Sequence, residues 1–259
     1  MDHEKKVRRL EDHVGEYRFR IKNSNDLKLE NEVFDIPTLK ALYTLSAKNF
    51  ITAMGGAISS GKEAIVFHAI GEDNRELAVK IYRINNSDFQ KMQDYMIGDP
   101  RFSNVKPQKK AIVFAWTKKE HRNLEKAKEA GIRVPEPIVS ERNILIMEFL
   151  GHDGVAAPRL KDVHLEDPER IYNIIAHDMA LLYQVAKLVH ADLSEFNILL
   201  YDNEPVIIDV GQAVMRDHPM SDEFLSRDIK NIVRYFKKLG VDCTEEKLKA
   251  EITKVKVII

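Results

Sequence analysis

The sequence predicts an α+β protein with two lobes, the first rich in strands and the second mainly helical. Strand-like runs separated by turn residues dominate the N-terminal half. From Pro168 onward the pattern turns helical. The 259 residues, 44% of them hydrophobic, suffice for one large domain or two small lobes.

The expected elements of the first half centre on a hairpin. Pro37 is suited to open a helix, and Gly55-Gly56 are expected to break that segment. Strands are predicted at Ala64–Ile70 and Leu77–Ile84, after a glycine-containing loop. The polar stretch 85–110 is expected to be a flexible loop. The apolar face of the first helix is expected from Leu39, Leu42, Tyr43 and Leu45, with further elements at Ala115–Ala130 (helix), Ile138–Val139 and Asn143–Leu150 (strands).

The second half begins with a connection at Gly151–Pro158. Its other expected elements are a helix at Glu169–Leu188, short apolar runs at Asn197–Leu200 and Val206–Asp209, and helices capped by Ser221 and Thr244, the first of these ending near Gly240. The predicted domains are an N-terminal helical extension at 1–50, a first lobe at 51–148 and a reduced helical second lobe at 149–259.

Composition narrows the classes of function. The single cysteine, Cys243, excludes an intrachain disulfide framework, and no apolar run approaches the roughly 20 residues of a membrane span. We therefore expect a cytoplasmic protein without a membrane partner. The net charge is −1, yet residues 101–133 hold ten Lys or Arg against three Glu. That run is either a solvated face or a footprint for RNA or another acidic partner; DNA is not expected.

Three polar residues predict a phosphotransferase centre. Asp192 and Asn197 lie five apart in a loop that leads into a strand, and Asp209 follows twelve residues later. Phosphoryl transfer needs one carboxylate to orient the attacking oxygen, and an Asn and a second Asp to hold Mg²⁺ against the phosphates. Turn aspartates with a capping Asn are the alternative, but the order and spacing of the three favour catalysis.

A lysine and a glycine loop fit the same chemistry. Lys80 stands on an otherwise apolar strand, as a phosphate-pairing lysine would, with Glu120 as its expected partner and Glu125 as the spare. The stretch from Gly56 to Lys62 matches most of a Walker A motif, but Glu63 replaces the hydroxyl residue and a strand follows. A loop that covers phosphates, with Gly61 approaching closely and Ser60 donating, fits better.

These motifs resemble the RIO family of atypical protein kinases over about 51–239. The matching stretches are Ser60–Ala64, Tyr95–Gly98 with Arg101-Phe102, Lys119–Leu124, His190–Asn197 and Ile208–Gln212. The sequences of these motifs are most similar to those of the first RIO subfamily. Residues 1–50 show no sign of the winged helix typical of the second subfamily.

The resemblance implies a two-lobe protein-kinase-like fold that uses ATP with Mg²⁺ or Mn²⁺. It implies that Asp192 is catalytic, that Asn197 and Asp209 bind metal, and that Lys80 and Glu120 form the phosphate-positioning pair. The remaining ATP-binding residues that it implies are Ser60, Gly61, Lys62 and Glu63 in the phosphate loop and Met147, Glu148 and Leu150 in the hinge.

The resemblance also implies an activity and a partner. The family phosphorylates itself on serine and acts in maturation of the small ribosomal subunit, and it has been proposed to act mainly as an ATPase through the metal-binding aspartate. Ser87 and Ser103 are the candidate phosphoacceptors. His190-Ala-Asp192 lacks the arginine of ordinary kinases, and only 50 residues follow Asp209, so ordinary peptide recognition is not expected.

Two other classes of function remain as alternatives. Small-molecule kinases of the aminoglycoside or choline type share the His-x-Asp…Asn loop, but this sequence lacks their long helical insertion after Asp209. A nucleotide-switched module that docks on RNA is the second alternative. It predicts that neutralising Lys109, Lys110, Lys118 and Lys119 would abolish docking.

Overall fold

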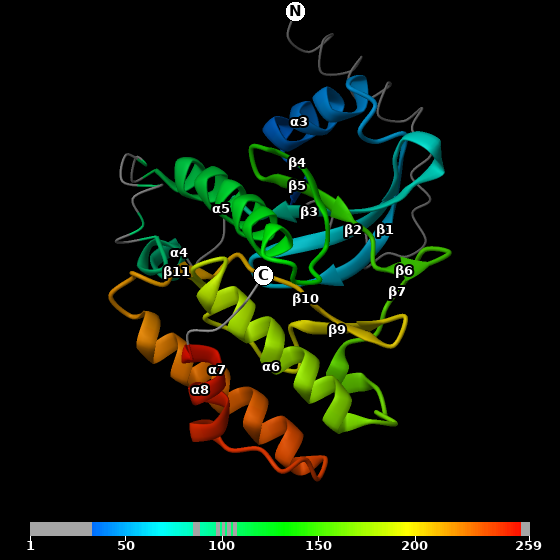
Figure 1. Cartoon of the computed structure of the whole chain (residues 1–259). Helices are drawn as coiled ribbons and strands as arrows, with labels where there is room; N and C mark the ends of the chain where they lie inside the picture. Colours follow the sequence, from blue (N-terminus) through cyan, green and yellow to red (C-terminus); the bar gives the residue numbers. More distant parts are fainter. Residues whose placement is uncertain are drawn as a thin grey trace, which may run out of the picture. The chain divides into compact units, whose positions relative to one another are not determined.

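The computed structural model describes residues 33–84, 89–96, 99, 102, 105 and 108–254. The chain divides into two compact units (Figure 1). The first unit contains the described part of Met1–Asn86 together with Ile138–Phe149, and the second contains Ser87–Pro137 and Leu150–Ile259. Within the part of the chain that is described, no helix combines the length and the apolar character needed to cross a bilayer.

In its described residues, the first unit is a five-stranded sheet with one helix against it (Figure 1). The strand order is β1-β2-β3-β5-β4, and the β1–β2, β2–β3 and β3–β5 pairs are antiparallel. The strands are β1 (Ala53–Ser60), β2 (Ala64–Ile70), β3 (Glu76–Tyr82), β4 (Pro137–Glu141) and β5 (Ile144–Glu148).

Helix α3 (Ile36–Ala47) is capped by Asp35, which accepts a hydrogen bond from the Thr38 amide at 2.9 Å. The helix was expected, but its buried face holds Thr38, Ala41, Leu42 and Leu45, whereas Tyr43 is exposed. Ala41, Leu42 and Leu45 share one hydrophobic core with the sheet residues Phe67, Val79 and Ile146.

Strand β1 was missed because Gly55-Gly56 indicated a break. In the structure Gly55 lies within the strand, where a Cβ would come within 2.9 Å of His68 Nδ1 and 3.1 Å of its carbonyl oxygen. Glycine therefore permits the close approach of β1 to β2 at this point.

The second unit is mainly helical. Its helices are α4 (Phe89–Asp94), α5 (Lys109–Glu129), α6 (Pro168–Gln184), α7 (Ser221–Lys238) and α8 (Glu245–Thr253). Its short strands are β6 (Gly151–His152), β7 (Val155–Ala156), β8 (Leu188–Val189), β9 (Ile198–Tyr201), β10 (Glu204–Ile207) and β11 (Val214–Met215). Helices α6, α7 and α8 pack together, and the rings of Tyr172 and Phe236 meet edge to face at 5.4 Å.

Several elements differ from the sequence-based expectations, and helix α6 ends at Gln184 rather than at Leu188, which lies in β8. Helix α5 begins at Lys109 rather than near Ala115, and α4 occupies part of the stretch expected to be a flexible loop. Thr244 caps α8 as expected, but Ser221 lies buried inside α7 and Met220 takes the cap position.

Strands β9 and β10 form a tight hairpin whose base separates two important loops. The register pairs Ile198 with Ile207 and Tyr201 with Glu204, so Asp202 and Asn203 make a two-residue turn. Their φ angles are 52° and 62°, both in the left-handed region that the commonest two-residue hairpin turn requires.

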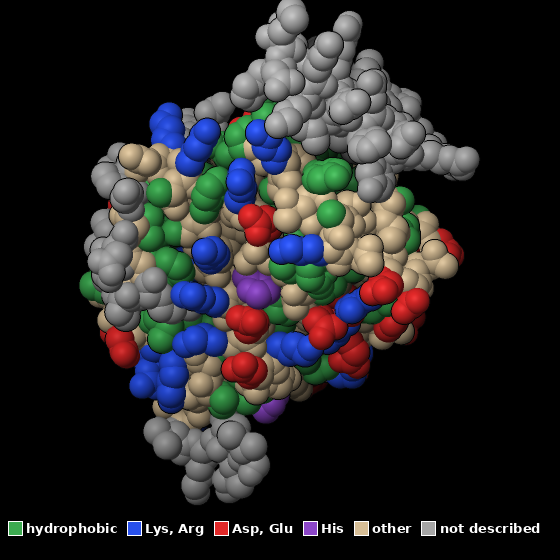
Figure 2. All heavy atoms as spheres, turned by 90° about the horizontal axis from the view of Figure 1, so that it is seen from above, with side chains coloured by type: hydrophobic (Ala, Val, Ile, Leu, Met, Phe, Trp, Pro, Cys, Tyr) green, Lys and Arg blue, Asp and Glu red, His purple; other side chains and the backbone are tan. Residues whose placement is uncertain are grey.

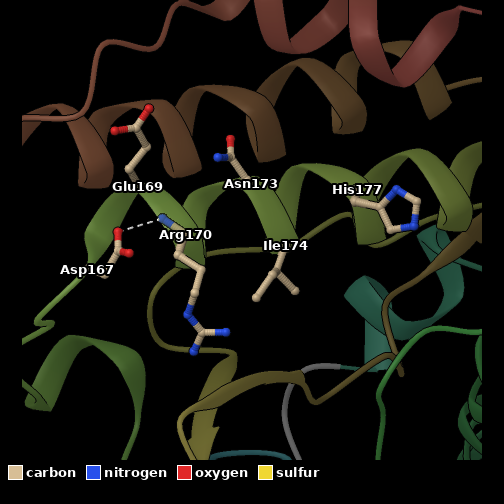
Figure 3. Close-up of a pocket in the computed structure, with 6 residues that line it drawn as sticks. All are labelled: Asp167, Glu169, Arg170, Asn173, Ile174 and His177. Carbon is tan, nitrogen blue, oxygen red and sulfur yellow. Dashed lines mark hydrogen bonds between the residues drawn. The ribbon is translucent and has the colours of Figure 1, made fainter.

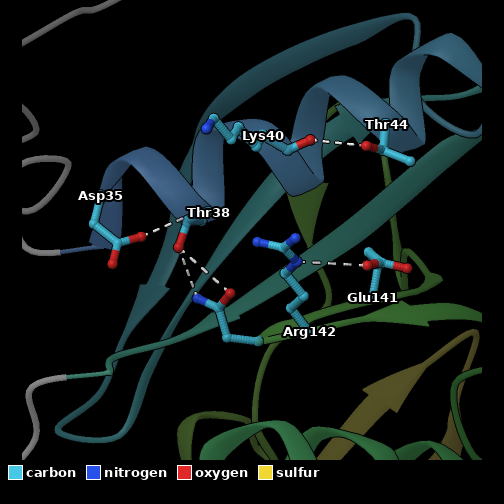
Figure 4. A network of polar contacts seen from close by, with 7 residues as sticks. Asp35, Thr38, Lys40, Thr44, Glu141 and Arg142 are labelled. Carbon is cyan, nitrogen blue, oxygen red and sulfur yellow. Dashed lines mark hydrogen bonds and ion pairs between the residues drawn. The ribbon is translucent and has the colours of Figure 1, made fainter. Parts of the chain in front are cut away.

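A buried polar network ties α3 to the sheet (Figure 4). Asn143 Nδ2 donates to Thr38 Oγ1 at 3.0 Å and to the Tyr82 carbonyl oxygen at 2.9 Å. Asn143 and Thr38 are buried, so both depend on this pairing. Thr44 on the same helix is exposed, and its hydroxyl bonds locally to the Lys40 carbonyl oxygen.

We expect Thr38→Val to lower the free energy of unfolding by about 1 kcal/mol, because it removes one buried hydrogen bond while keeping the side-chain shape. Thr44→Val makes the same chemical change on the exposed side of α3 and should cost less than about 0.5 kcal/mol. Urea denaturation of both variants measures the difference. Equal destabilisation would show that the network contributes nothing particular.

A second prediction concerns Asp178, which is buried on α6. Burial raises the pKa of its carboxyl to about 7, and the charge of Glu204 adds to the rise. The folded protein therefore binds this proton more tightly than the unfolded chain. The resulting stability is present below the unfolded pKa and is lost as the pH rises through about 7.

Asp178→Asn should accordingly raise the free energy of unfolding at about pH 8 by on the order of 1 kcal/mol relative to wild type. The gain should shrink as the pH falls toward about 4. Denaturation at several pH values measures it, with the exposed Asp217→Asn as control. A gain that does not change with pH would contradict the raised pKa.

Candidate active site

The catalytic loop, residues 190–197, runs from β8 to β9 in the second unit. Asn197 Nδ2 donates to the Asp192 carbonyl oxygen at 2.9 Å and to its Oδ2 at 3.2 Å. The Asn197 amide donates to the Ser194 carbonyl oxygen at 2.9 Å. The loop thus turns back on itself and places the Asp192 carboxylate beside the Asn197 side chain, whose Oδ1 is not used in these bonds.

The metal loop, residues 209–213, follows β10 and lies beside the catalytic loop. The Ile208 amide donates to the Asn197 carbonyl oxygen at 3.0 Å, and His190 Nε2 lies 3.0 Å from the Ile208 carbonyl oxygen. Asp209 is exposed and has a φ of 60°, a left-handed conformation that few non-glycine residues adopt. The hairpin and these contacts bring together the three residues predicted from their spacing.

The electrostatics of Asp192 suit a proton acceptor. Burial raises the pKa of its carboxyl, His190 opposes that rise, and the charge of Asp209 adds to it. A carboxylate whose pKa is raised takes a proton more readily from an attacking hydroxyl. The charge of Asp209 thus reaches the Asp192 carboxyl, so the two carboxylates lie close enough to interact.

The donor set of the two loops fits Mg²⁺. Carboxylate oxygens of Asp209 and Asp192 and the amide oxygen of Asn197 are hard oxygen ligands, the type that Mg²⁺ prefers. Mg²⁺ commonly takes only one or two protein ligands and completes its shell with phosphates and water. The residues present therefore fit the expected metal.

Helix α7 anchors the catalytic loop with residues that the sequence analysis did not identify. Asp228, only 1% exposed, accepts hydrogen bonds from the amides of Ala191 and Leu193, both at 2.8 Å. Burial raises the pKa of Asp228 to about 6, while His190 and these two amides oppose the rise. Asn231 donates to the Leu193 carbonyl oxygen at 3.1 Å.

Arg227, next to Asp228, donates to the Ala191 carbonyl oxygen. Ala191 stands where ordinary kinases carry an arginine, and in this structure the arginine that reaches the backbone at this point comes from α7. Its charge also lowers the pKa of Asp192 against the effect of burial. One sequence signal could have revealed this anchor: Asp228 interrupts the apolar stripe of α7 formed by Phe224, Leu225, Ile229 and Ile232.

Some of the residues predicted to contact the nucleotide belong to the first unit and others to the second. In the first unit, Ser60 ends β1, and Gly61–Glu63 make the turn into β2, where the Gly61 amide donates to the Ala64 carbonyl oxygen at 2.9 Å. A strand begins at Ala64 where a Walker A motif would start a helix, which excludes that motif. Ser60, Gly61 and Lys62 are exposed.

Lys80 lies on β3, 8% exposed, opposite Val66 on β2 and Leu145 on β5. Met147 and Glu148, half-buried at the end of β5, pair with β3. Adjacent strands thus carry the phosphate loop, the lysine and the first part of the hinge. Glu120 and Leu150 belong to the second unit and are buried; the pairing of Glu120 with Lys80 stays a prediction.

A cavity of about 550 Å³ lies on α6 (Figure 3). It is lined by Asp167, Glu169, Arg170, Asn173, Ile174 and His177. Arg170 reaches Glu204 Oε1 at 2.8 Å beside it. None of the predicted site residues lines this cavity, so it is separate from the two loops.

Only some of the lysines in the basic run on α5 are exposed to solvent. Lys109, Lys110 and Lys118 are exposed, and Figure 2 shows Lys and Arg side chains gathered on one part of the face that it displays. Lys119 is 0% exposed and is therefore not a docking residue, contrary to the expectation from the sequence. Its role is internal.

Fold and site together define a class. A sheet with a lysine on its third strand, and a helical unit with an Asp–Asn loop followed by a second Asp, are the parts of a protein-kinase-like phosphotransferase. The family profile of the RIO domain matches residues 65–248. The chain belongs to the RIO family, and it is a serine/threonine protein kinase rather than a small-molecule kinase.

Similar proteins support this membership. The chain is 46% identical to the RIO-type serine/threonine-protein kinase Rio1 of Haloferax volcanii, over 95% of this chain and 85% of the relative. Its identity to Rio1 of Methanocaldococcus jannaschii is 44%, over 88% and 78%. Human serine/threonine-protein kinase RIO1 is 38% identical over 86% of this chain, but only 40% of the human protein is covered.

Among solved structures, the Rio2 kinase of Chaetomium thermophilum in an ADP/Mg²⁺-phosphoaspartate complex matches with a TM-score of 0.64. The match covers 83% of this chain and 66% of the Rio2 chain at 24% identity. At that identity the likeness establishes the fold, and the kinase-like fold predicted from the sequence is confirmed.

We expect Asp228→Asn to lower kcat about 10- to 100-fold, because an amide cannot accept from both backbone N–H groups and Asp192 loses its position. The KM for ATP should change less. The exposed Asp222→Asn on the same helix is the matched control. A folded Asp228→Asn variant with wild-type kcat would contradict this assignment.

Proposed function

We propose that this kinase binds ATP with Mg²⁺ or Mn²⁺ and transfers the γ-phosphate to serine, including a serine of its own chain, or releases it as free phosphate. The proposal is carried by one observation: Asp192, Asn197 and Asp209 lie on two loops that meet at the base of the β9–β10 hairpin, where the Ile208 amide donates to the Asn197 carbonyl oxygen. That arrangement supplies a proton acceptor beside two ligands for a cation.

In this proposal Asp192 orients the attacking oxygen and accepts its proton. Asn197 and Asp209 hold the metal, which neutralises the phosphate charge when it is bound. Lys80, paired with Glu120, positions the phosphates, and the loop Ser60–Glu63 covers them. The backbone of the hinge at Glu148 and Leu150, together with Met147, contacts the adenine.

Two routes for the phosphate are open to this site. The names of the archaeal relatives support transfer to serine or threonine. The phosphoaspartate of the Rio2 complex supports a second route, in which an aspartate receives the phosphate and water then releases it. Here the exposed Asp209 is the residue proposed for that route. The candidate acceptors Ser87 and Ser103 lie outside the described residues.

We further propose that the kinase acts in the cytoplasm in maturation of the small ribosomal subunit. The exposed Lys109, Lys110 and Lys118 support contact with the RNA of such a particle, because exposed lysines attract phosphate groups. The same observation favours the second candidate function, a nucleotide-switched module that docks on RNA.

Incubation with γ-labelled ATP and Mg²⁺, following label on the protein and as free phosphate, tests the proposal. Asp192→Ala should lower both signals at least about 100-fold through loss of the proton acceptor. Asp209→Ala should abolish them through loss of the metal. The exposed Asp217→Ala is the control.

The form of the label separates the routes. Acid-stable label on serine supports the kinase route, whereas free phosphate with a hydroxylamine-sensitive label that Asp209→Ala removes supports the acyl-phosphate route. Wild type that binds ATP but gives neither signal would favour the docking module. Variants at Asp192 and Asp209 with wild-type rates would overturn the assigned roles.

A further inference from the structure

Helix α5 holds the metal loop by side-chain hydrogen bonds to its backbone. Asn123 Nδ2 donates to the carbonyl oxygens of Val210, at 2.9 Å, and Ala213, at 3.0 Å. Lys119 Nζ donates to those of Gly211, at 2.7 Å, and Ala213, at 2.5 Å. Lys119 and Asn123 lie four residues apart and so share one face of the helix. We call these two residues the α5 clamp.

Burying the Lys119 ammonium costs free energy, and its hydrogen bonds to the loop carbonyl oxygens offset part of that cost. The side chain is 0% exposed, and its Nζ also lies 5.0 Å from the centre of the Trp116 ring. A buried charge pays a large desolvation cost, and an apolar side chain of similar volume often fills such a place at least as well. The presence of a lysine here is therefore better explained by its directed hydrogen bonds to the loop than by packing.

The metal loop needs such support because its conformation is strained. Asp209 has a φ of 60°, and a non-glycine residue persists in that region only when its surroundings hold it there. The loop also turns tightly, since the Ala213 amide donates to the Val210 carbonyl oxygen at 3.1 Å. Three of its carbonyl oxygens are fixed by the α5 clamp, directly after the residue whose side chain faces the proposed metal.

We propose that Lys119 and Asn123 are positioning residues that hold the loop 209–213 in its strained form and thereby set the affinity of the site for Mg²⁺. The inference rests on the proposed function, in which Asp209 is a metal ligand. Neither clamp residue contacts the metal in this proposal; both act through the backbone of the loop. Glu120, expected to pair with Lys80, lies between them on the same helix.

Three variants test the α5 clamp. Lys119→Met removes the donors and the charge but keeps a long side chain, and Asn123→Ala removes the other pair of bonds. Lys128→Met is the matched control, because Lys128 is an exposed lysine on the same helix. For each variant we would measure the Mg²⁺ concentration that half-saturates binding of a fluorescent ADP, and the amide hydrogen exchange of residues 209–213.

Both clamp variants should raise the half-saturating Mg²⁺ concentration about tenfold or more, as loss of groups that orient a metal ligand commonly does. Exchange in residues 209–213 should become faster. Lys128→Met should match wild type in both measurements. If Lys119→Met does not fold, the neutral substitution Asn123→Ala carries the test alone.

The two readouts separate two kinds of failure. Folded clamp variants with wild-type exchange, and with half-saturation within about twofold of wild type, would overturn the role of the α5 clamp. Wild type without Mg²⁺-dependent ADP binding would instead overturn the metal assignment of Asp209, and the exchange rates would still decide whether α5 holds the loop.

Discussion

The amides of Ala191 and Leu193 donate to one carboxylate, that of Asp228, and the residue between them is Asp192. Backbone groups on both sides of Asp192 are thereby fixed to α7, a helix whose apolar stripe is embedded in the second unit. Burying the carboxylate is costly, which is why its pKa rises, and the two amides offset part of that cost. The position of Asp192 thus depends on the stability of the helical core.

The same principle applies to the second loop, with the direction of donation reversed. On α7 a carboxylate accepts from loop amides, whereas on α5 an ammonium and an amide donate to loop carbonyl oxygens. Both loops contain a residue in the left-handed region, Ala191 at 66° and Asp209 at 60°. Strained backbone persists where its surroundings over-determine it, and here two helices do so. The rigid helices, rather than the loops themselves, define the geometry of the centre.

Much of the site could be predicted because its residue types are required by chemistry at fixed spacing. Asp192, Asn197 and Asp209 were identified from the sequence, as were the two short apolar runs that form the hairpin between them. The supporting residues were not, because Asp228 and Lys119 bind backbone groups. The break that Asp228 makes in the apolar stripe of α7 marks a buried acid in the sequence, but it does not say what that acid binds, because backbone partners are common to every residue.

The prediction of the fold succeeded where periodicity and turn chemistry agreed, and it failed where they conflicted. Gly55-Gly56 concealed β1, because the close approach to His68 that requires Gly55 exists only once the strands pair. Lys109 and Lys110 looked like part of a polar loop, although they form the exposed first turn of α5. The roles of Lys80, Glu120 and the hinge residues remain predictions.

The β9–β10 hairpin has a consequence for how such a chain can change in length. Asn197 and Asp209 both lie just beyond the base of this hairpin, so the twelve positions that separate them run up one strand and down the other. Adding or removing residues in matched pairs, one per strand, would move the hairpin tip and leave Asn197 and Asp209 in register. Loss of a single residue would turn one strand over and send its adjoining side chain to the opposite face. Length variation at this point in related chains should therefore come in even steps.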